Sequence, residues 1–253
     1  MSRFKDKVAV ITGGAGGMGI ELCRHFIAEG ARVVLMDAVA SAVDKAVTEV
    51  GAGCVGMSCD VSDEAAVNAA FDQVARELGR IDVLVAAAGV RPMAQLMTQS
   101  VQEWDRCMRI NLTGVLLTNR AAARHMLAAG KGAIVNIASV NGVRACEGMG
   151  AYNVSKAGVI MLTKTLACEL GPTGVRVNAI LPAQVETPMI AEQVGAERQR
   201  REDRIPMGRY GKPHEIATAV AFLASDDASF ITGHELALDG GYLAFGFRPA
   251  VYA

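Results

Sequence analysis

Seven short apolar segments recur along this chain, and the stretches between them carry apolar residues at the 3.6-residue period of a helix. Short apolar strands that alternate with helices are typical of a parallel sheet covered by helices on both faces. The sequence therefore predicts an α/β fold built on a doubly wound parallel sheet of about seven strands. The predicted strands span residues 8–12, 31–37, 53–59, 81–88, 133–138, 175–181 and 235–239.

The chain has 253 residues, of which 51% are hydrophobic, and no linker interrupts the pattern, so we expect a single domain over residues 1–253. A net charge of -1 gives no reason to expect nucleic acid or an anionic membrane as a partner. No apolar run approaches the roughly 18 residues that cross a bilayer, and the first residues lack a signal-peptide pattern. These features predict a cytoplasmic protein.

A glycine-rich turn, TGGAGGMG at residues 12–19, lies directly between the first apolar run and a helical stretch that ends at Gly30. Glycines in such a turn let backbone N–H groups approach a pyrophosphate, which then lies at the positive end of the helix. We assign this role to Gly13, Gly17 and Gly19. A simple tight turn is the alternative, but the strand, turn and helix context indicates a Rossmann-like dinucleotide site.

The second predicted strand ends at Asp37, eighteen residues beyond Gly19. A carboxylate at this position can accept hydrogen bonds from an adenosine ribose, and it repels a 2′-phosphate. Ala38 and Val39 provide no cation that would bind such a phosphate. The pattern favours NAD(H) over NADP(H), with a helix-capping or loop aspartate as the alternative.

Tyr152 and Lys156 lie four residues apart in a helix predicted over residues 151–171, and Ser139 ends an apolar run thirteen residues before Tyr152. Residues i and i+4 share one helix face, so the lysine ammonium is expected beside the phenol. A nearby positive charge lowers the pKa of a phenol from its usual value of ~10, which would make Tyr152 a proton donor and acceptor. Ser139 can hydrogen-bond an oxygen on which charge develops. An isolated pair of this kind is ordinary on helices, but the other motifs favour the catalytic interpretation.

Together these motifs resemble the short-chain dehydrogenase/reductase family over most of the chain, from about Lys5 to Gly241. The TGxxxGxG motif of the family is met by Thr12, Gly13, Gly17 and Gly19, and its YxxxK motif by Tyr152 and Lys156. Its active-site serine, its helix-borne asparagine and its adenine-contacting aspartate fall on Ser139, on Asn111 in RINLTG and on Asp60. The segment ITGHELALDGG resembles the one that forms the last strand of the family's sheet.

The resemblance implies a fuller set of site residues. Catalysis would involve Asn111, Ser139, Tyr152 and Lys156, with Lys156 on the nicotinamide ribose and Asn111 supporting a water that passes protons toward Lys156. The cofactor would contact Gly13, Gly17, Met18, Gly19, Asp37, Asp60, Val61, Gly89, Tyr152, Lys156, Pro182 and Thr187. The substrate would be flanked by Asn141, Arg144, Glu147, Met149, Gln184 and Met189.

The polar interval at residues 184–212 is too long for an ordinary connection, and the resemblance makes it a mobile lid that closes over the substrate. Family members that resemble this chain form homotetramers through two long helices and the C-terminal strand region. The tail at residues 242–253 carries four aromatic residues and is too apolar to be left in water, so we expect it to pack at an interface. These are Tyr242, Phe245, Phe247 and Tyr252.

Two positions depart from the family pattern. Ala86, Ala87 and Ala88 precede Gly89 where the family usually has NNAG, so side-chain amides that normally hold the central strands are missing. Ala183 follows Pro182 where a glycine is usual. Neither change removes a proton-transfer group, so we expect an effect on local stability or hinge flexibility before one on activity.

Arginines crowd the lid and follow two of the strands that border the site. They are Arg198, Arg200, Arg201, Arg204 and Arg209 in the lid, and Arg91 and Arg144 after the fourth and fifth predicted strands. Arginine forks suit carboxylate, sulfonate or phosphate groups, so an anionic substrate is one interpretation. Interleaved Glu197, Glu202 and Asp203 indicate instead a solvated helix with local ion pairs.

Six cysteines and four histidines are scattered without a paired zinc spacing, so we expect structural thiols and no metal site.

These observations predict an NAD(H)-dependent oxidoreductase that interconverts a secondary alcohol and a ketone. One alternative is a reductase of 3-oxo groups on an acyl carrier protein, which Asp37 disfavours because the resemblance associates that role with NADPH. Another is a dinucleotide-binding regulator that senses the NAD redox state without turnover. Such a regulator has no need of an intact relay of Asn111, Ser139, Tyr152 and Lys156.

Overall fold

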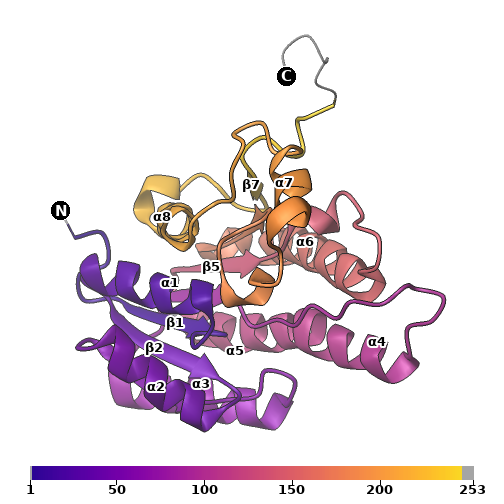
Figure 1. The fold of residues 1–253 in the computed structure, drawn as a ribbon. Helices are drawn as coiled ribbons and strands as arrows, with labels where there is room; N and C mark the ends of the chain where they lie inside the picture. Colours follow the sequence, from indigo (N-terminus) through magenta and orange to yellow (C-terminus); the bar gives the residue numbers. More distant parts are fainter. Residues whose placement is uncertain (1, 247–253) are drawn as a thin grey trace.

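The centre of the molecule is one parallel sheet of seven strands, shown as a ribbon in Figure 1; the computed structural model describes residues 2–246. The strand order is β3-β2-β1-β4-β5-β6-β7, so the chain winds outward from β1 in one direction and then crosses to build the other half from β4. The predicted doubly wound sheet is confirmed. The strands are β1 (Val8–Thr12), β2 (Arg32–Asp37), β3 (Cys54–Ser58), β4 (Val83–Ala86), β5 (Gly132–Ile137), β6 (Val175–Pro182) and β7 (Glu235–Leu238).

Helices cover both faces of the sheet, as the alternating pattern predicts. The α-helices are α1 (Gly17–Ala28), α2 (Ala40–Val50), α3 (Glu64–Leu78), α4 (Val101–Met108), α5 (Gly114–Ala129), α6 (Gly150–Leu170), α7 (Gly195–Glu202) and α8 (Pro213–Ala224). The buried side chains of α1, α2 and α8 share one apolar core, and those of α3 and α5 share a second core with the C-terminal half of α6. In Figure 1, α1 and α8 accordingly lie together on one side of the strands and α5 on the other.

The central strand β1 shows why the apolar runs are continuous. Val8 and Val10 face the core beneath α3 and α5, whereas Ala9 and Ile11 face the core beneath α1 and α8. Successive side chains of a strand point to opposite faces, and both faces are covered here, so an apolar residue is needed at every position. All five residues of β1 are buried.

The central strands are held together by polar groups other than the asparagines missing from the segment 86–88. The Thr12 hydroxyl oxygen accepts hydrogen bonds from the backbone N–H groups of Ala87 at 3.2 Å and Ala88 at 3.4 Å, which ties the end of β1 to the end of β4. Behind them, the Asn136 amide on β5 exchanges two hydrogen bonds with the Asn119 amide on α5 and donates a third to the Thr163 hydroxyl on α6. Alanines are therefore tolerated beside β1.

The interval at residues 184–212 is folded. It contains a 3₁₀ turn at Pro188–Ile190 and helix α7, which lies in the orange segment of Figure 1. Gln193, Ile205 and Tyr210 are buried, and the Tyr210 hydroxyl donates to the Gln193 side-chain oxygen at 3.0 Å.

The C-terminal tail is described as far as Gly246, so Phe247 and Tyr252 lie outside the described residues. Tyr242 packs within its own chain, beneath the guanidinium groups of Arg144 and Arg204 at 5.7 and 5.6 Å from the ring centre. Its packing is therefore explained without a neighbouring subunit. Through residues 2–246, no helix combines the length and the apolar composition needed to span a membrane.

Candidate active site

The sequence-predicted site residues meet at the carboxyl edge of the sheet, where doubly wound folds bind their ligands. Two adjoining cavities lie there. One is a groove beside the glycine turn, and the other is a cavity around Ser139, Tyr152 and Lys156. Met18, Gly89 and Thr187 line both, so a ligand in the groove can reach into the second cavity.

The glycine turn needs its glycines for steric reasons. Gly13 has a φ of 65°, in the left-handed region, and a Cβ there would lie 2.7 Å from the Ala88 Cα. A Cβ on Gly19 would collide with the Gly13 carbonyl oxygen, so Gly19 lets α1 begin close against the turn. No side chain caps the amino end of α1, so this end of the helix remains able to bind an anion.

Asp37 lines the groove but not the second cavity. One carboxylate oxygen accepts a hydrogen bond from the Ala15 N–H in the glycine turn at 3.3 Å, and the other accepts one from the Ala38 N–H at 2.8 Å. The carboxylate thus supports the loop while facing the groove that Asp37 lines.

The groove has a volume of about 550 Å³. Of the twelve residues expected to contact the cofactor, nine line it and the other three line the adjoining cavity. The nine are Gly13, Gly17, Met18, Gly19, Asp37, Asp60, Val61, Gly89 and Thr187, and the three are Tyr152, Lys156 and Pro182. One Asp60 carboxylate oxygen is engaged by the backbone N–H and hydroxyl of Ser62, so Asp60 also shapes the loop after β3.

Four of the six residues expected around the substrate line the second cavity, namely Asn141, Met149, Gln184 and Met189. The structure does not bring Arg144 or Glu147 to it. The Arg144 guanidinium is drawn onto the Tyr242 ring, and the Glu147 carboxylate accepts a hydrogen bond from the Gln95 amide at 3.2 Å. Both side chains leave the loop after β5 in directions that spacing alone does not reveal.

The pKa of Tyr152 is raised, contrary to the expectation from the Tyr–Lys spacing. Part of the tyrosine surface is exposed, yet desolvation of the phenol by the surrounding atoms is the largest influence on its pKa. It outweighs a hydrogen bond with Ser139 and the positive charge of Arg91, both of which lower the pKa. A raised pKa keeps the phenol protonated at neutral pH.

Lys156 is buried, and its Nζ donates to the Ile137 carbonyl oxygen at 2.7 Å. It lies 5.7 Å from the centre of the Tyr152 ring, so the shared helix face is as expected although the ammonium points toward β5. Desolvation lowers the pKa of Lys156 to about 8.

Asn111 is buried in a π-helical turn at Arg109–Thr113 between α4 and α5. Its amide donates to the Val90 carbonyl at 2.8 Å and its carbonyl accepts from the Val90 N–H at 2.8 Å. A Cβ on Gly89 would lie 3.3 Å from the Asn111 side-chain oxygen and 3.7 Å from the Lys156 Nζ. The absence of a side chain at Gly89 therefore leaves a space between Asn111 and Lys156.

Arg91 lines the second cavity, which agrees with its predicted place after a strand that borders the site, although it was not in the set expected to flank the substrate. It follows Ala87 by four residues, in the loop that leaves β4 at the carboxyl edge of the sheet. Backbone placement is what the motif fixes, whereas the direction of a long side chain depends on the lid packed against it.

The arginines of the lid form ion pairs. Arg198 pairs with Glu186 at 2.7 Å and Glu202 at 2.8 Å, Arg201 pairs with Glu197 at 2.8 Å, and Arg209 pairs with Glu215 at 2.7 Å. None of these arginines lines the second cavity. The ion-pair interpretation of the interleaved charges is therefore confirmed for these three.

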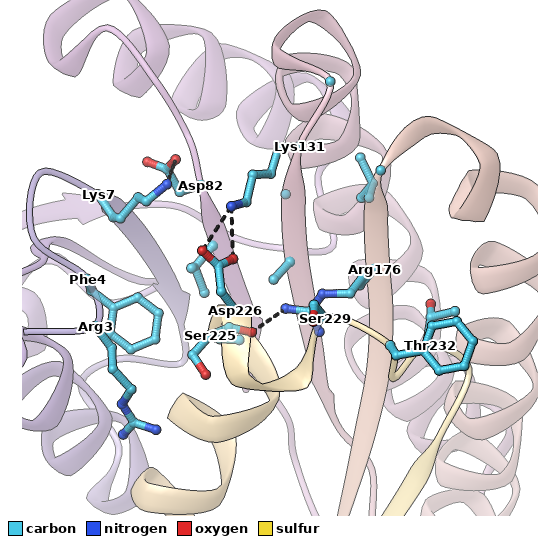
Figure 2. A pocket seen from close by; sticks show the side chains of 18 of the residues that line it. Arg3, Phe4, Lys7, Asp82, Lys131, Arg176, Ser225, Asp226, Ser229 and Thr232 are labelled. Carbon is cyan, nitrogen blue, oxygen red and sulfur yellow. Dashed lines mark hydrogen bonds and ion pairs between the residues drawn. The ribbon is translucent and has the colours of Figure 1, made fainter.

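A cavity of about 710 Å³, larger than the groove, lies at the opposite edge of the sheet, where β4, β5 and β6 begin (Figure 2). Its charged groups have protein partners. Lys131 pairs with Asp226 at 2.9 Å, and the Arg176 guanidinium donates to the carbonyl oxygens of Leu223 and Ser225 at 2.7 and 2.8 Å. These cations stabilise the start of β6 and the end of α8, and none of the sequence-predicted site residues is nearby. Within residues 2–246, no group of three His, Cys, Asp or Glu side chains could hold a metal ion.

Comparison with known proteins agrees with this geometry. Residues 13–243 match a family model described as enoyl-(acyl carrier protein) reductase. The chain is 43% identical over 244 residues to the cis-4-hydroxycyclohexanecarboxylate dehydrogenase of Sinomonas cyclohexanicum, which covers 95% of this chain and 98% of that protein. It is 41% identical over 250 residues to the meso-2,3-butanediol dehydrogenase of Serratia marcescens, which covers 98% and 99% of the two chains.

Among solved structures, an NAD⁺-bound xylitol dehydrogenase is similar to this chain with a TM-score of 0.90 and 34% identity, covering 94% of this chain and 100% of that one. The similarity therefore extends over nearly the whole chain.

Proposed function

Because the chain belongs to the short-chain dehydrogenase/reductase family, we propose that it interconverts a secondary alcohol and a ketone with NAD(H) as the hydride carrier. One observation carries this proposal. Ser139, Tyr152 and Lys156 line a cavity that adjoins the glycine-lined groove. The two relatives act, by their names, on a hydroxycyclohexanecarboxylate and on 2,3-butanediol, both of which are secondary alcohols.

The groove fits a dinucleotide. Gly13 and Gly17 leave backbone N–H groups approachable at the amino end of α1, where a pyrophosphate is favoured. Asp37 provides a carboxylate for ribose hydroxyl groups. In this proposal the other cofactor contacts come from Met18, Gly19, Asp60, Val61, Gly89, Tyr152, Lys156, Pro182 and Thr187. Bound NAD would supply hydride acceptance and return, and the protein would supply placement and proton transfer.

Tyr152 exchanges the proton with the substrate oxygen. In the reduction direction its protonated phenol donates to the ketone oxygen, which accords with its raised pKa. In the oxidation direction it must first lose that proton, and the charge of Arg91 favours the loss. Ser139 hydrogen-bonds the substrate oxygen and thereby holds it beside the phenol.

Lys156 and Asn111 connect Tyr152 to solvent. The space that Gly89 leaves between the two side chains is suited to a water that passes protons toward Lys156. Asn111 would act by positioning, since its amide is fixed by two hydrogen bonds to Val90. Residues 184–212 act as the lid of this single-domain enzyme, and Met189 of this segment lines the cavity.

An NAD-reduction screen across secondary alcohols, polyols and hydroxy acids tests the proposal. We expect absorbance of NADH to appear with at least one secondary alcohol and the reverse reaction to consume the matching ketone. Tight NAD binding without turnover of any substrate would instead indicate a regulator that senses the NAD redox state.

We expect the enzyme to prefer NAD over NADP, and Asp37→Ala to narrow that preference by about tenfold, the equivalent of roughly 1.4 kcal/mol. A 2′-phosphate beside the carboxylate is repelled and lacks a partner. The measurement is the ratio of kcat/KM for the two cofactors. Asp37→Asn is the matched control. It removes the negative charge but keeps a side-chain oxygen that accepts from the Ala15 N–H, so it separates the effect of charge from the effect of losing this hydrogen bond. Equal use of both cofactors by the wild type would exclude this role for Asp37.

We also propose a homotetramer. Apolar side chains stand exposed on α6, on α8 and just before β7, namely Met161, Phe222 and Phe230. Phe230 is 101% exposed, which favours contact with another chain at that position. Light scattering at micromolar concentration should give a mass four times that of one chain, and a monomer would contradict the proposal.

A cytoplasmic location is part of the same proposal. All six cysteines are free thiols in the structure, which suits a reducing compartment.

A further inference from the structure

Arg91 occupies an unusual position for a cation. Its side chain is 11% exposed and lines the cavity that also contains Ser139 and Tyr152. Lys156 is the other cationic residue of that cavity, and its amine is engaged by the Ile137 carbonyl oxygen. Arg91 is therefore the charged group within this cavity that is placed to meet a substrate.

The hydrogen bonds of Arg91 are incomplete. Its Nη2 donates to the Met189 carbonyl at 2.7 Å and to the Glu192 carboxylate at 2.6 Å, both in the lid. Its Nε is buried and has no hydrogen-bond partner among residues 2–246. A buried N–H of a charged group is costly without an acceptor, so an oxygen bound at Nε would remove that cost.

We propose that Arg91 determines substrate class by binding an anionic group, a carboxylate or a sulfonate, on the alcohol or ketone. The Nε and Nη2 groups form the side-on edge of a guanidinium, and once Glu192 has left Nη2, the two N–H groups of this edge can bind two oxygens of one anion. The carbinol oxygen lies at Ser139 and Tyr152, and the anionic group lies at Arg91. This inference rests on the proposed oxidoreductase function and adds the chemistry of the substrate.

The other arginines do not compete for this role. Arg198, Arg201 and Arg209 are paired with glutamates of their own surroundings, and Arg144 and Arg204 are stacked on Tyr242. Glu192 is 62% exposed at the rim, so an incoming anion can replace it on Arg91 while the carboxylate returns to water. An anionic substrate would also replace a contact that now joins the β4 loop to the lid.

The test uses matched pairs of hydroxy acids and their carboxamides, 4-hydroxycyclohexanecarboxylate and 3-hydroxybutyrate among them. We expect the wild type to prefer the acid of at least one pair by about tenfold or more in kcat/KM, the equivalent of 1.4 kcal/mol. The preference should weaken with salt. It should disappear in Arg91→Gln, survive in part in Arg91→Lys, and be unchanged in Arg200→Gln, which alters an exposed lid arginine.

Binding provides a second readout that needs no turnover. Cyclohexanecarboxylate and cyclohexanecarboxamide lack the hydroxyl group, so calorimetric titration in the presence of NADH measures recognition of the anion alone. Tighter binding of the acid that is lost in Arg91→Gln supports the inference even if no alcohol is oxidised, in which case the proposed function fails by itself. The inference about Arg91 would be overturned if acid and amide bind equally and are used equally, with no change in Arg91→Gln. Arg91 would then only connect the β4 loop to the lid through its hydrogen bonds.

Discussion

Tyr152→Phe is expected to lower turnover by about 10²- to 10⁴-fold while NAD(H) binding is largely retained, because the change deletes the transferable proton and keeps the ring. The ring lies 5.7 Å from the Lys156 ammonium, and the phenylalanine preserves that packing. The groove proposed to hold the dinucleotide is lined chiefly by the start of α1 and by the segments that follow β1, β2, β3 and β4. Loss of the hydroxyl group should therefore affect proton transfer and leave the affinity for the cofactor.

The measurement is kcat with the best alcohol of the screen, together with NADH affinity from fluorescence titration. Tyr242→Phe is the matched control, since it removes a phenolic hydroxyl from a ring that Arg144 and Arg204 hold outside the cavity. We expect the control to behave as the wild type. Turnover of Tyr152→Phe within about threefold of the wild type would be incompatible with a general acid or base at this residue.

Most of the fold could be predicted because it depends on local patterns. Each strand was recognisable as a β-branched or apolar run, and the boundaries found for β1 and for α6 differ from the predicted ones by no more than a residue. Such strands can be recognised from the sequence because they are buried on both faces, so every position of β1 must be apolar. The glycine turn was equally clear, because Gly13 adopts a backbone conformation that other residues avoid.

The electrostatics of the site could not be predicted from spacing. The i, i+4 rule correctly placed Lys156 beside the Tyr152 ring. It could not reveal that the ammonium is bound by the Ile137 carbonyl, nor that desolvation dominates the pKa of the phenol. Burial and carbonyl direction are properties of strands β4 to β6 packed together, and they appear only in three dimensions.

The direction of long side chains in loops also could not be predicted from the sequence. Asn141 and Arg144 follow β5 in one loop, yet only Asn141 lines the cavity because Arg144 is stacked on Tyr242 from the C-terminal segment. Arg91 shows the reverse, since contacts with Met189 and Glu192 direct it into the cavity. In both cases a partner roughly a hundred residues away in sequence decides the direction.

Lys156 should make the protein less stable near neutral pH than it would be without the charge. Desolvation lowers its pKa from 10.5 to about 8 in the folded protein, whereas the unfolded chain retains the ordinary value. Below pH 8 both states carry the proton, and the folded state bears the full penalty of a buried ammonium. Between pH 8 and 10.5 the unfolded state binds more protons, so this contribution to the free energy of unfolding rises with pH.

The corresponding variant is Lys156→Met, which keeps a long unbranched side chain and removes the charge. Since one pKa unit corresponds to about 1.36 kcal/mol, the free energy of unfolding of the wild type should gain roughly 3 kcal/mol over the variant as the pH rises from about 8 to about 10.5. The loss of the donor to the Ile137 carbonyl adds an offset that does not vary over this range.

Denaturant unfolding of the wild type and of Lys156→Met at a series of pH values measures the difference in their free energies of unfolding. Lys45→Met, which changes an exposed lysine, is the control. A difference that stays constant would mean that the amine is not desolvated in the fold. A difference that widens over this range would show that the fold keeps a destabilising ammonium beside Tyr152.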